Sequence, residues 1–487
     1  MKRYEKFADD IAEMIRSGVL AAGQRVPSVR YASQTHGISP STVFQAYYLL
    51  ERRGLIRARP RSGYFVNDSF VNESIASQRF EIPAVPEALP ANQVSESTEV
   101  DVSELVFSVL ESIKDPNTVP FGSAFPSAGL FPLQRLARSL ASATRDMDPS
   151  MVVSDLSPGN PVLRRQIALR YMVAGQVLPM EELLITNGAL EALNLCLQAV
   201  TEPGDLVAIE APAFYACLQV LERLKLKAVE IPVHPQTGID LAVLEQTLQR
   251  HPVKACWSMT SFQNPTGATV SQDRKRDLVE LLRRHQVPLI EDDVYAELYY
   301  GQNAPKPAKA FDTEGLVLHC GSFAKSLAPG YRVGWVAAGR YAQKVERLKL
   351  MTSLCASMPA QAAIADYLQH GGYDRHLRKL RNSLEDQLRA MLGAVARHFP
   401  PQTRVSQPSG GYFLWLELPE QIDSLKVFQM ALAQGISIAP GPMFSPTRRF
   451  KNCIRLNYGS PWNETCERAM ETLGKIIRSM MGSHTAP

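Results

Sequence analysis

The fold of this chain is decided by the stretch His319-Cys-Gly-Ser-Phe-Ala-Lys-Ser-Leu-Ala-Pro-Gly-Tyr-Arg-Val-Gly-Trp-Val336. An apolar run, Leu316 to Leu318, predicts a strand that delivers Ser322 and Lys325 into a turn containing glycine and proline. Arg332 follows seven residues after the lysine, so an amine lies between a hydroxyl and a guanidinium. This arrangement suits a cofactor with an aldehyde and a phosphate, because the lysine forms a Schiff base while Ser322 and Arg332 hold phosphate oxygens.

Three further polar segments follow other apolar runs: Thr186-Asn-Gly-Ala-Leu-Glu191, Asn264-Pro-Thr-Gly267 and Glu291-Asp-Asp-Val-Tyr295. In the last, a carboxylate held against a pyridine nitrogen keeps it protonated, as pyridoxal phosphate chemistry requires. The Asn264 amide suits a hydrogen bond to a ring oxygen, and the first segment opens a helix whose N–H groups point at an anion. Taken singly, the first segment is equally an ordinary helix start, the second a β-turn and the third a solvated acidic loop. Together, and ahead of Lys325 in the chain, they indicate one site.

The same part of the chain alternates short apolar runs with helical patterns such as Arg274 to His285. This alternation predicts an α/β fold with a mainly parallel sheet. Ligands of such sheets bind at the carboxyl ends of the strands, where the candidate residues fall. The predicted strands are Leu206–Ile209, Ala228–Val233, Ala255–Met259, Val287–Ile290, Leu316–Leu318 and Val333–Ala337.

Composition describes an ordinary globular protein of two or more domains, with 487 residues, 45% hydrophobic and 21% charged. The seven cysteines show no CxxC spacing and are odd in number, so we expect reduced thiols, no metal site and a cytoplasmic protein. No run approaches the ~18 apolar residues of a membrane span.

Residues 1–66 hold 11 Lys and Arg against 5 Asp and Glu, a net charge of +6, which leaves a net charge of −2 for the rest of the chain. We expect this basic head to meet a polyanion.

The basic head shows a helix-turn-helix pattern. Residues 4–17 carry apolar residues at helical spacing, Ser28 caps a second short helix that Gly37 closes, and Ser39-Pro40 opens a third. The polar N-terminal end of the third helix leaves Ser41, Thr42 and Gln45 free for base edges in the major groove.

A hairpin follows the third helix. Leu55–Arg59 and Gly63–Val66 alternate as two strands, and their turn makes a basic wing. The arginines Arg57, Arg59 and Arg61 suit phosphate contacts, although a solvated hairpin has the same composition.

The head resembles the winged helix-turn-helix of GntR-type regulators. The resemblance rests on Arg25-Val-Pro-Ser-Val-Arg30, Ser39-Pro-Ser-Thr-Val-Phe-Gln-Ala-Tyr47, Leu50-Glu-Arg-Arg-Gly-Leu-Ile56 and Ser62-Gly-Tyr-Phe-Val66. It implies DNA contacts from Arg30, Ser39, Thr42 and the turn at Gly63. Pro40 stands where many members carry a basic residue, so one phosphate contact fewer is expected.

Residues 69–115 form the expected linker between the head, residues 1–68, and the body, residues 116–487. Prolines and the acidic segment Ser95–Glu104 are typical of a tether, and its tail, Leu105 to Ile113, is expected to be helical.

The body resembles a fold-type I aminotransferase over about residues 116–480, with a smaller C-terminal α+β subdomain, and with its GntR-like head the chain is similar to the MocR family of pyridoxal-phosphate-dependent transcriptional regulators. The resemblance implies that Lys325, the catalytic lysine of the enzymes, carries pyridoxal 5′-phosphate as an aldimine. It further implies the following contacts: Asp292 with the pyridine nitrogen, Asn264 and Tyr295 with the ring hydroxyl, Phe214 (alternatively Tyr215) stacked on the ring, Gly188, Ala189, Ser322 and Arg332 with the phosphate, and Arg455 with a substrate or effector carboxylate.

Ser154 departs from the family pattern, because many relatives carry there a tyrosine that reaches the cofactor phosphate across a dimer. Its loss implies weaker cofactor binding by ~1.5–3 kcal/mol, one charge-assisted hydrogen bond. The resulting interpretation is a dimeric regulator that senses an amino compound, or pyridoxal phosphate itself, and binds operator DNA. The alternatives are a working aminotransferase of amino acids and 2-oxo acids with an accessory DNA-binding domain, and a dimerisation domain with an inactive cofactor site.

Overall fold

The computed structural model describes residues 3–16, 20, 23–53, 55–59, 63–67, 83–86, 97–100, 102–148, 157–301, 303–370 and 372–482. The chain divides into two compact units, Met1–Glu81 and Ile82–Pro487, which we call the head and the body. Arg61 and Ser154 lie outside the described residues.

The head contains three helices, α1 (Arg3–Arg16), α2 (Val29–His36) and α3 (Pro40–Arg52). The caps are those predicted: Ser28 accepts a hydrogen bond from the Tyr31 N–H, and Ser39 accepts one from the Thr42 N–H. Gly37 ends α2 with a φ of 60°, a left-handed conformation that a residue with a side chain adopts at a cost.

The wing of the head is the antiparallel pair β1 (Ile56–Arg59) and β2 (Gly63–Val66), in register from Ile56↔Val66 to Arg59↔Gly63. The two strands and three helices share one small core that contains Phe7, Ile11, Val43, Tyr47, Leu50 and Ile56. The winged helix-turn-helix prediction is confirmed.

The body is built on a large sheet with the strand order β3-β7-β6-β9-β10-β11-β12-β5, and β8 pairs with β7. The central strands β7, β6, β9, β10 and β11 are parallel, whereas β12, β5, β3 and β8 pair antiparallel. The prediction of a mainly parallel sheet is confirmed. The strands are β3 (Thr98–Glu99), β5 (Leu183–Thr186), β6 (Leu206–Ala211), β7 (Lys227–His234), β8 (Gly238–Ile239), β9 (Val253–Ser258), β10 (Leu289–Asp292), β11 (Val317–Ser322) and β12 (Gly334–Ala337).

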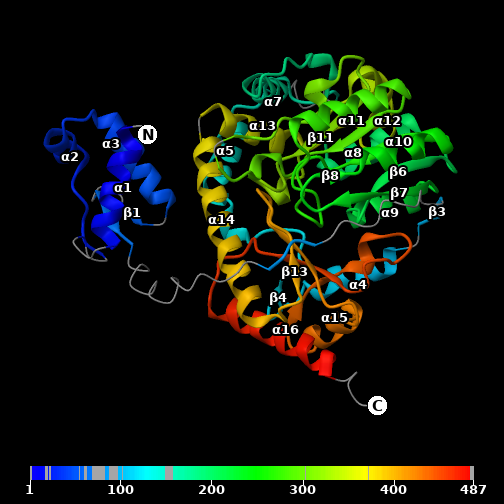
Figure 1. Ribbon diagram of the computed structural model, residues 1–487. Coiled ribbons are helices and arrows are strands. Elements are labelled where there is room, and N and C mark those ends of the chain that lie inside the picture. The colour runs from blue at the N-terminus through cyan, green and yellow to red at the C-terminus, as the bar shows by residue number, and fades with distance from the viewer. Residues whose placement is uncertain are drawn as a thin grey trace. The chain divides into compact units, whose positions relative to one another are not determined.

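Helices cover both faces of this sheet, as Figure 1 shows, because the central strands are rich in apolar residues and are buried on both sides. One face packs against α8 and α9 and the other against α10 and α11. The helices of the body are α4 (Ser103–Ser112), α5 (Leu133–Arg145), α7 (Pro161–Val173), α8 (Ala189–Val200), α9 (Tyr215–Arg223), α10 (Leu241–Arg250), α11 (Gln272–Arg284), α12 (Ala342–Thr352), α13 (Met358–Gln369), α14 (Gly372–His398), α15 (Ser424–Leu432) and α16 (Glu464–Gly482).

A smaller α+β part closes the body, as expected from the resemblance. Its antiparallel sheet has the order β13-β14-β17-β16, and a short parallel pair joins β15 to β4. In Figure 1 it lies below the large sheet with α15 and α16, and α14 runs beside both parts. The strands are β4 (Val119–Pro120), β13 (Arg404–Val405), β14 (Phe413–Glu417), β15 (Ile436–Ser437), β16 (Ala439–Pro440) and β17 (Cys453–Asn457).

Residues 98–112, expected in the linker, are part of the body. Thr98 pairs with Ala228 on β7, so β3 extends the large sheet. On α4, Val106 and Val109 are fully buried in the main core, and the Ser103 hydroxyl donates to Glu222 at 2.9 Å. The apolar spacing in this segment therefore determines its structure, and Glu104, at the start of α4, is exposed.

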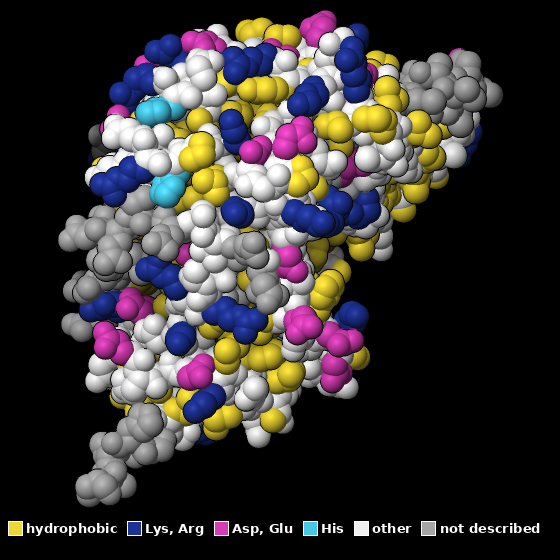
Figure 2. Space-filling view, turned by 90° about the vertical axis from the view of Figure 1, so that its right-hand side faces the viewer, with side chains coloured by type: hydrophobic (Ala, Val, Ile, Leu, Met, Phe, Trp, Pro, Cys, Tyr) yellow, Lys and Arg dark blue, Asp and Glu magenta, His cyan; other side chains and the backbone are white. Residues whose placement is uncertain are grey.

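None of the described helices is both long enough and apolar enough to cross a membrane. On the face shown in Figure 2, Lys and Arg side chains are interspersed with Asp and Glu.

Candidate functional site

The residues expected to bind the phosphate come together where β11, β12 and β5 lie side by side. The register places Ser322 opposite Gly334, and Gly334 opposite Thr186. Two residues after Thr186, Gly188 caps the N-terminus of α8, so its own N–H and that of Ala189 belong to the unpaired amides at a helix start. Residues far apart in the sequence thus meet as predicted.

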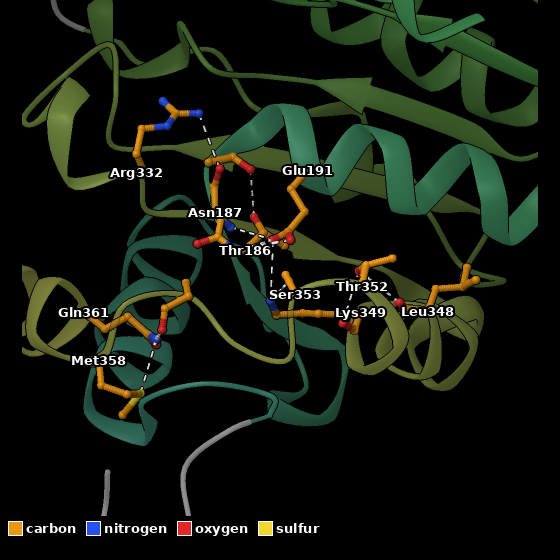
Figure 3. A network of polar contacts seen from close by, with 12 residues as sticks. Thr186, Asn187, Glu191, Arg332, Leu348, Lys349, Thr352, Ser353, Met358 and Gln361 are labelled. Carbon is orange, nitrogen blue, oxygen red and sulfur yellow. Dashed lines mark hydrogen bonds and ion pairs between the residues drawn. The ribbon is translucent and has the colours of Figure 1, made fainter. Parts of the chain in front are cut away.

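Arg332 lies over this helix start because its backbone is left-handed, with φ 51° and ψ 45°. Its guanidinium donates to the Asn187 carbonyl at 3.3 Å, which Figure 3 shows beside the start of α8. A Cβ on Gly188 would lie 2.5 Å from Arg332 Nη2, and one on Gly334 would lie 2.6 Å from the Gly188 carbonyl carbon. Gly188 therefore makes room for the arginine and Gly334 for the backbone at the start of α8, and with Arg332 they form what we call the phosphate cradle.

A buried polar network holds the start of α8 in place, and sequence analysis missed it. The Glu191 carboxylate accepts from the Asn187 N–H at 2.6 Å, and the buried Lys349 ammonium lies 3.4 Å from it. Lys349 also donates to Ser353 at 3.0 Å, and Figure 3 shows these side chains converging between α8 and α12. A buried lysine next to a glutamate is visible only once the two helices are packed together.

Lys325 lies in the turn after β11, where its Nζ donates to the Ala124 carbonyl at 2.8 Å and lies 3.6 Å from the centre of the Phe125 ring. Burial, together with the positive charges of Arg455 and Arg332, lowers the pKa of this amine to about 7 against the opposing effect of the Asp292 carboxylate. The lowered pKa increases the fraction of Lys325 that is uncharged, and therefore nucleophilic, at neutral pH.

Asp292 ends β10 beside Cys320 in the register of β11 and is 1% exposed. Burial raises the pKa of its carboxyl to about 7, against the opposing effects of the Val294 N–H and the Lys325 charge. Neither carboxyl oxygen has a hydrogen-bond partner of good geometry in the part of the chain that the structure describes. A buried acid of this kind fits a ligand that brings its own positively charged N–H.

The residues expected around the cofactor ring lie close to these groups. Tyr295 is buried with its ring edge-on to Tyr412, 5.4 Å between centres, and burial raises the pKa of its hydroxyl. Asn264 is fully buried, and its Nδ2 has no partner among the described residues. Phe214 caps α9 and is half-buried, with its ring 4.8 Å from that of Tyr215.

Arg455, on β17, is fully buried. Its guanidinium donates to Asn264 Oδ1 at 3.0 Å and to the Gly122 carbonyl at 2.6 Å, and it lies 4.3 Å from the centre of the Phe413 ring. Burial lowers the pKa of Arg455, and within the described residues no carboxylate pairs with it. A buried guanidinium with neutral partners has a strong preference for an anion.

The carbonyls of Gly122–Phe125, which we call the strap, accept the donors of the site. Ser123 accepts from Arg455 at 3.1 Å and Asn457 at 2.9 Å, and the Ala124 carbonyl accepts from Lys325 and from Tyr412 at 3.0 Å. The strap was not predictable from the sequence, because it acts through backbone carbonyls, which carry no residue-type signal.

The residues expected to meet DNA lie on the surface of the head. Arg30, Ser41 and Gln45 are exposed and Thr42 and Arg57 are half-buried, while nothing is described of the Arg59 side chain. The Ser39 hydroxyl lies 2.8 Å from both the Ser41 and the Thr42 hydroxyls, so it is engaged in capping α3. Gly63 starts β2 with φ 99°, and the Arg25 side chain packs 3.3 Å from the position of a Cβ there.

Comparison with known proteins agrees with both halves of this description. Residues 132–473 match the family described as aminotransferase class I and II, and residues 3–66 match the bacterial regulatory proteins of the gntR family. The chain is a GntR-type regulator fused to an aminotransferase-like domain. This is the MocR-type combination predicted from the sequence.

Relatives share the whole length of this regulator. The HTH-type transcriptional regulators YdcR and YjiR of Escherichia coli are 47% and 36% identical over 99% of this chain and 100% of their own. The HTH-type transcriptional regulator NorG of Staphylococcus aureus is 24% identical over 94% of this chain and 100% of its own.

Solved structures match the body. The kynurenine aminotransferase of Pyrococcus horikoshii, in complex with PMP, has a TM-score of 0.72 at 29% identity and covers 78% of this chain and 95% of its own. The α-aminoadipate aminotransferase LysN of Thermus thermophilus, complexed with N-(5′-phosphopyridoxyl)-L-leucine, has a TM-score of 0.70 at 27% identity, with 79% of this chain and 100% of its own covered. The fold-type I prediction is confirmed.

Proposed function

We propose that this regulator binds operator DNA through its head and senses, through its body, an amino compound that carries a carboxylate. Pyridoxal 5′-phosphate is the cofactor of the body. The observation that carries the effector proposal is Arg455, a fully buried guanidinium with neutral partners beside a lysine whose pKa is about 7. The alternative effector, pyridoxal phosphate itself, uses the same site.

The residues of the body fit the cofactor. Neither carboxyl oxygen of Asp292 nor the Asn264 Nδ2 has a partner among the described residues, and the Arg332 guanidinium lies against Gly188 at the start of α8, where it suits a phosphate. When bound, the cofactor supplies an aldehyde for an amine and an electron-withdrawing ring. Lys325 supplies the amine, Asp292 keeps the ring nitrogen protonated, and Tyr295 and Asn264 orient the ring hydroxyl.

The effector meets two of the groups that now hold the strap. A carboxylate that takes the N–H groups of Arg455 competes with the Gly122 and Ser123 carbonyls. Attachment of the cofactor would withdraw the Lys325 amine from the Ala124 carbonyl, and an amine that displaces Lys325 would free that donor again. Effector binding therefore changes the hydrogen bonds of the strap. The DNA affinity of the head changes by the difference in effector binding free energy between the two conformations of the body.

We propose that the regulator is a homodimer that joins its bodies next to the phosphate cradle. Leu190, on α8, is 45% exposed, and on α12 Leu350 and Met351 are 42% and 74% exposed. The pair Glu191–Lys349 joins α8 to α12, so these exposed side chains belong to two neighbouring helices, and we infer that they contribute to one apolar surface beside the site. A second copy covers such a surface under twofold symmetry and gives two heads for two half-sites.

The test is the visible absorption spectrum of the full chain with pyridoxal phosphate, wild type beside Lys325→Ala, followed by titration with a panel of amino acids. The proposal expects a band that Lys325→Ala lacks and that one class of amino acid shifts without sustained 2-oxo acid formation. Absence of the band in the wild type would contradict the assigned site.

The second candidate is an active aminotransferase with an accessory DNA-binding domain. It is favoured by the presence of Lys325, Asp292 and Arg455 in one buried site. Sustained turnover of an amino acid and a 2-oxo acid in the same assay would establish it, whereas a single conversion per site supports sensing.

A further inference from the structure

The solvent face of α3 carries aromatic side chains as well as polar ones. Ser41, Phe44, Gln45 and Tyr48 are all exposed, and their spacing of three, four and seven residues places them on one face of the helix. The opposite face, with Val43, Tyr47 and Leu50, is fully buried in the core of the head. Sequence analysis named Ser41 and Gln45 and missed the two aromatic residues between and beyond them.

Phe44 does not serve the fold of the head. Its side chain is 52% exposed, whereas the core of the head closes around Tyr47, whose hydroxyl donates to the Pro27 carbonyl at 2.7 Å. An exposed phenylalanine on a small domain gains free energy from a partner that covers it.

The charge of the head selects the class of that partner. Residues 1–66 have a net charge of +6, and the head matches the gntR family of bacterial regulatory proteins. The partner is therefore double-stranded DNA, with α3 in the major groove. In that groove the base edges are polar apart from one group, the 5-methyl of thymine, which phenylalanine contacts favourably.

We propose that Phe44 determines operator specificity by packing its ring on the 5-methyl group of thymine, at a base pair that Ser41 or Gln45 flanks. This rests on the proposed DNA-binding function and extends it, because it assigns one base to one side chain. Four residues of helix span about 6 Å, so the contacts of Ser41, Phe44 and Gln45 fall within roughly two base pairs.

The test uses the full chain loaded with pyridoxal phosphate and a duplex pool with a randomised core. Duplexes that the wild type selects are resynthesised with uracil in place of thymine at single positions, which removes only the methyl group. We expect one position per half-site at which uracil weakens the wild type about fivefold, the value of a methyl group buried against a ring. Equal affinity for uracil and thymine at every position overturns the proposal.

The matching protein variant is Phe44→Ala. Phe44→Ala should bind the thymine duplex more weakly than the wild type by the same factor, and should bind the uracil duplex as tightly as the wild type does. Phe44→Leu should retain part of the preference for thymine over uracil. Phe107→Ala, which removes a phenylalanine 64% exposed on α4 of the body, is the control and should leave both affinities unchanged.

Two other outcomes would count against the proposal. Equal weakening of Phe44→Ala on thymine and uracil duplexes would assign Phe44 to the sugar-phosphate backbone or to another protein surface. Selection of no sequence by the wild type would overturn the DNA-binding function as well, whereas selection without a uracil effect overturns the thymine contact alone.

Discussion

Replacing Gly188 with alanine tests the phosphate cradle. The new Cβ lies 2.5 Å from Arg332 Nη2, so the guanidinium has to retreat by about 0.9 Å to restore the 3.4 Å of an ordinary contact. A hydrogen bond lengthened that far is lost. Loss of one charge-assisted hydrogen bond costs ~1.5–3 kcal/mol, which weakens pyridoxal phosphate binding about 10- to 150-fold.

Gly188→Ala also strains the backbone, because φ is 82°, and this costs about 1–3 kcal/mol of folding stability. Gly204→Ala is the matched control: φ is 94° there, and nothing lies within 4 Å of a Cβ. Both variants should lose similar stability in urea unfolding, and only Gly188→Ala should lose cofactor affinity in an absorption titration. The reasoning fails if Gly188→Ala binds the cofactor within twofold of wild type, or if the two variants lose affinity equally.

The other predictions concern the effector, pH and assembly. Arg455→Gln should weaken binding of the amino compound at least about 30-fold in the absorption titration, because a buried carboxylate loses its partner. The control Arg449→Gln, at a side chain that is 43% exposed, should leave this affinity unchanged. A loss of affinity below threefold in Arg455→Gln excludes Arg455 as the carboxylate site. The charged form of Lys325 is lost as pH rises through its lowered pKa of about 7. The rate of cofactor attachment, followed by stopped-flow absorption, should therefore rise about tenfold from pH 6 to pH 8 and then level off. A lysine of ordinary pKa would give a rate that continues to rise above pH 9. Met351→Glu should convert the proposed dimer to a monomer in sedimentation velocity. The control Val177→Glu, at a side chain that is 89% exposed in the segment after α7, should remain dimeric. If Met351→Glu is also dimeric, the interface lies elsewhere.

Several residues that we assign to the cofactor site follow a local signal in the chain. Strand, polar residue and turn recur at Thr186, Asn264, Asp292 and Ser322, and a parallel sheet brings the carboxyl ends of such strands to one edge. The caps Ser28 and Ser39 predicted the helices of the head in the same way, because a hydroxyl before an apolar run satisfies the free N–H groups of a helix start.

The features that were missed depend on contacts between distant segments. The strap acts through the carbonyls of Gly122–Phe125, and any sequence presents the same carbonyls. The helix at α4 was predicted but was assigned to the linker, because the acidic residues of this segment outweighed four valines that are buried in the main core (Val100, Val102, Val106 and Val109). β3 was not predicted, because its partner β7 lies more than a hundred residues away. Phe44 was passed over because an apolar residue in a helix is expected in the core, and only the packed head shows that it faces solvent.

The central claim is that occupancy of the body controls the head. Its most direct test is the affinity of the cofactor-loaded full chain for a selected operator duplex, measured with and without the amino acid that shifts the absorption band, in the wild type and in Arg455→Gln. We predict that the amino acid changes the operator Kd of the wild type by about 5- to 150-fold, the usual range of coupling between two sites, and leaves that of Arg455→Gln unchanged. An operator Kd that stays the same in the wild type while the amino acid saturates the site would contradict the account.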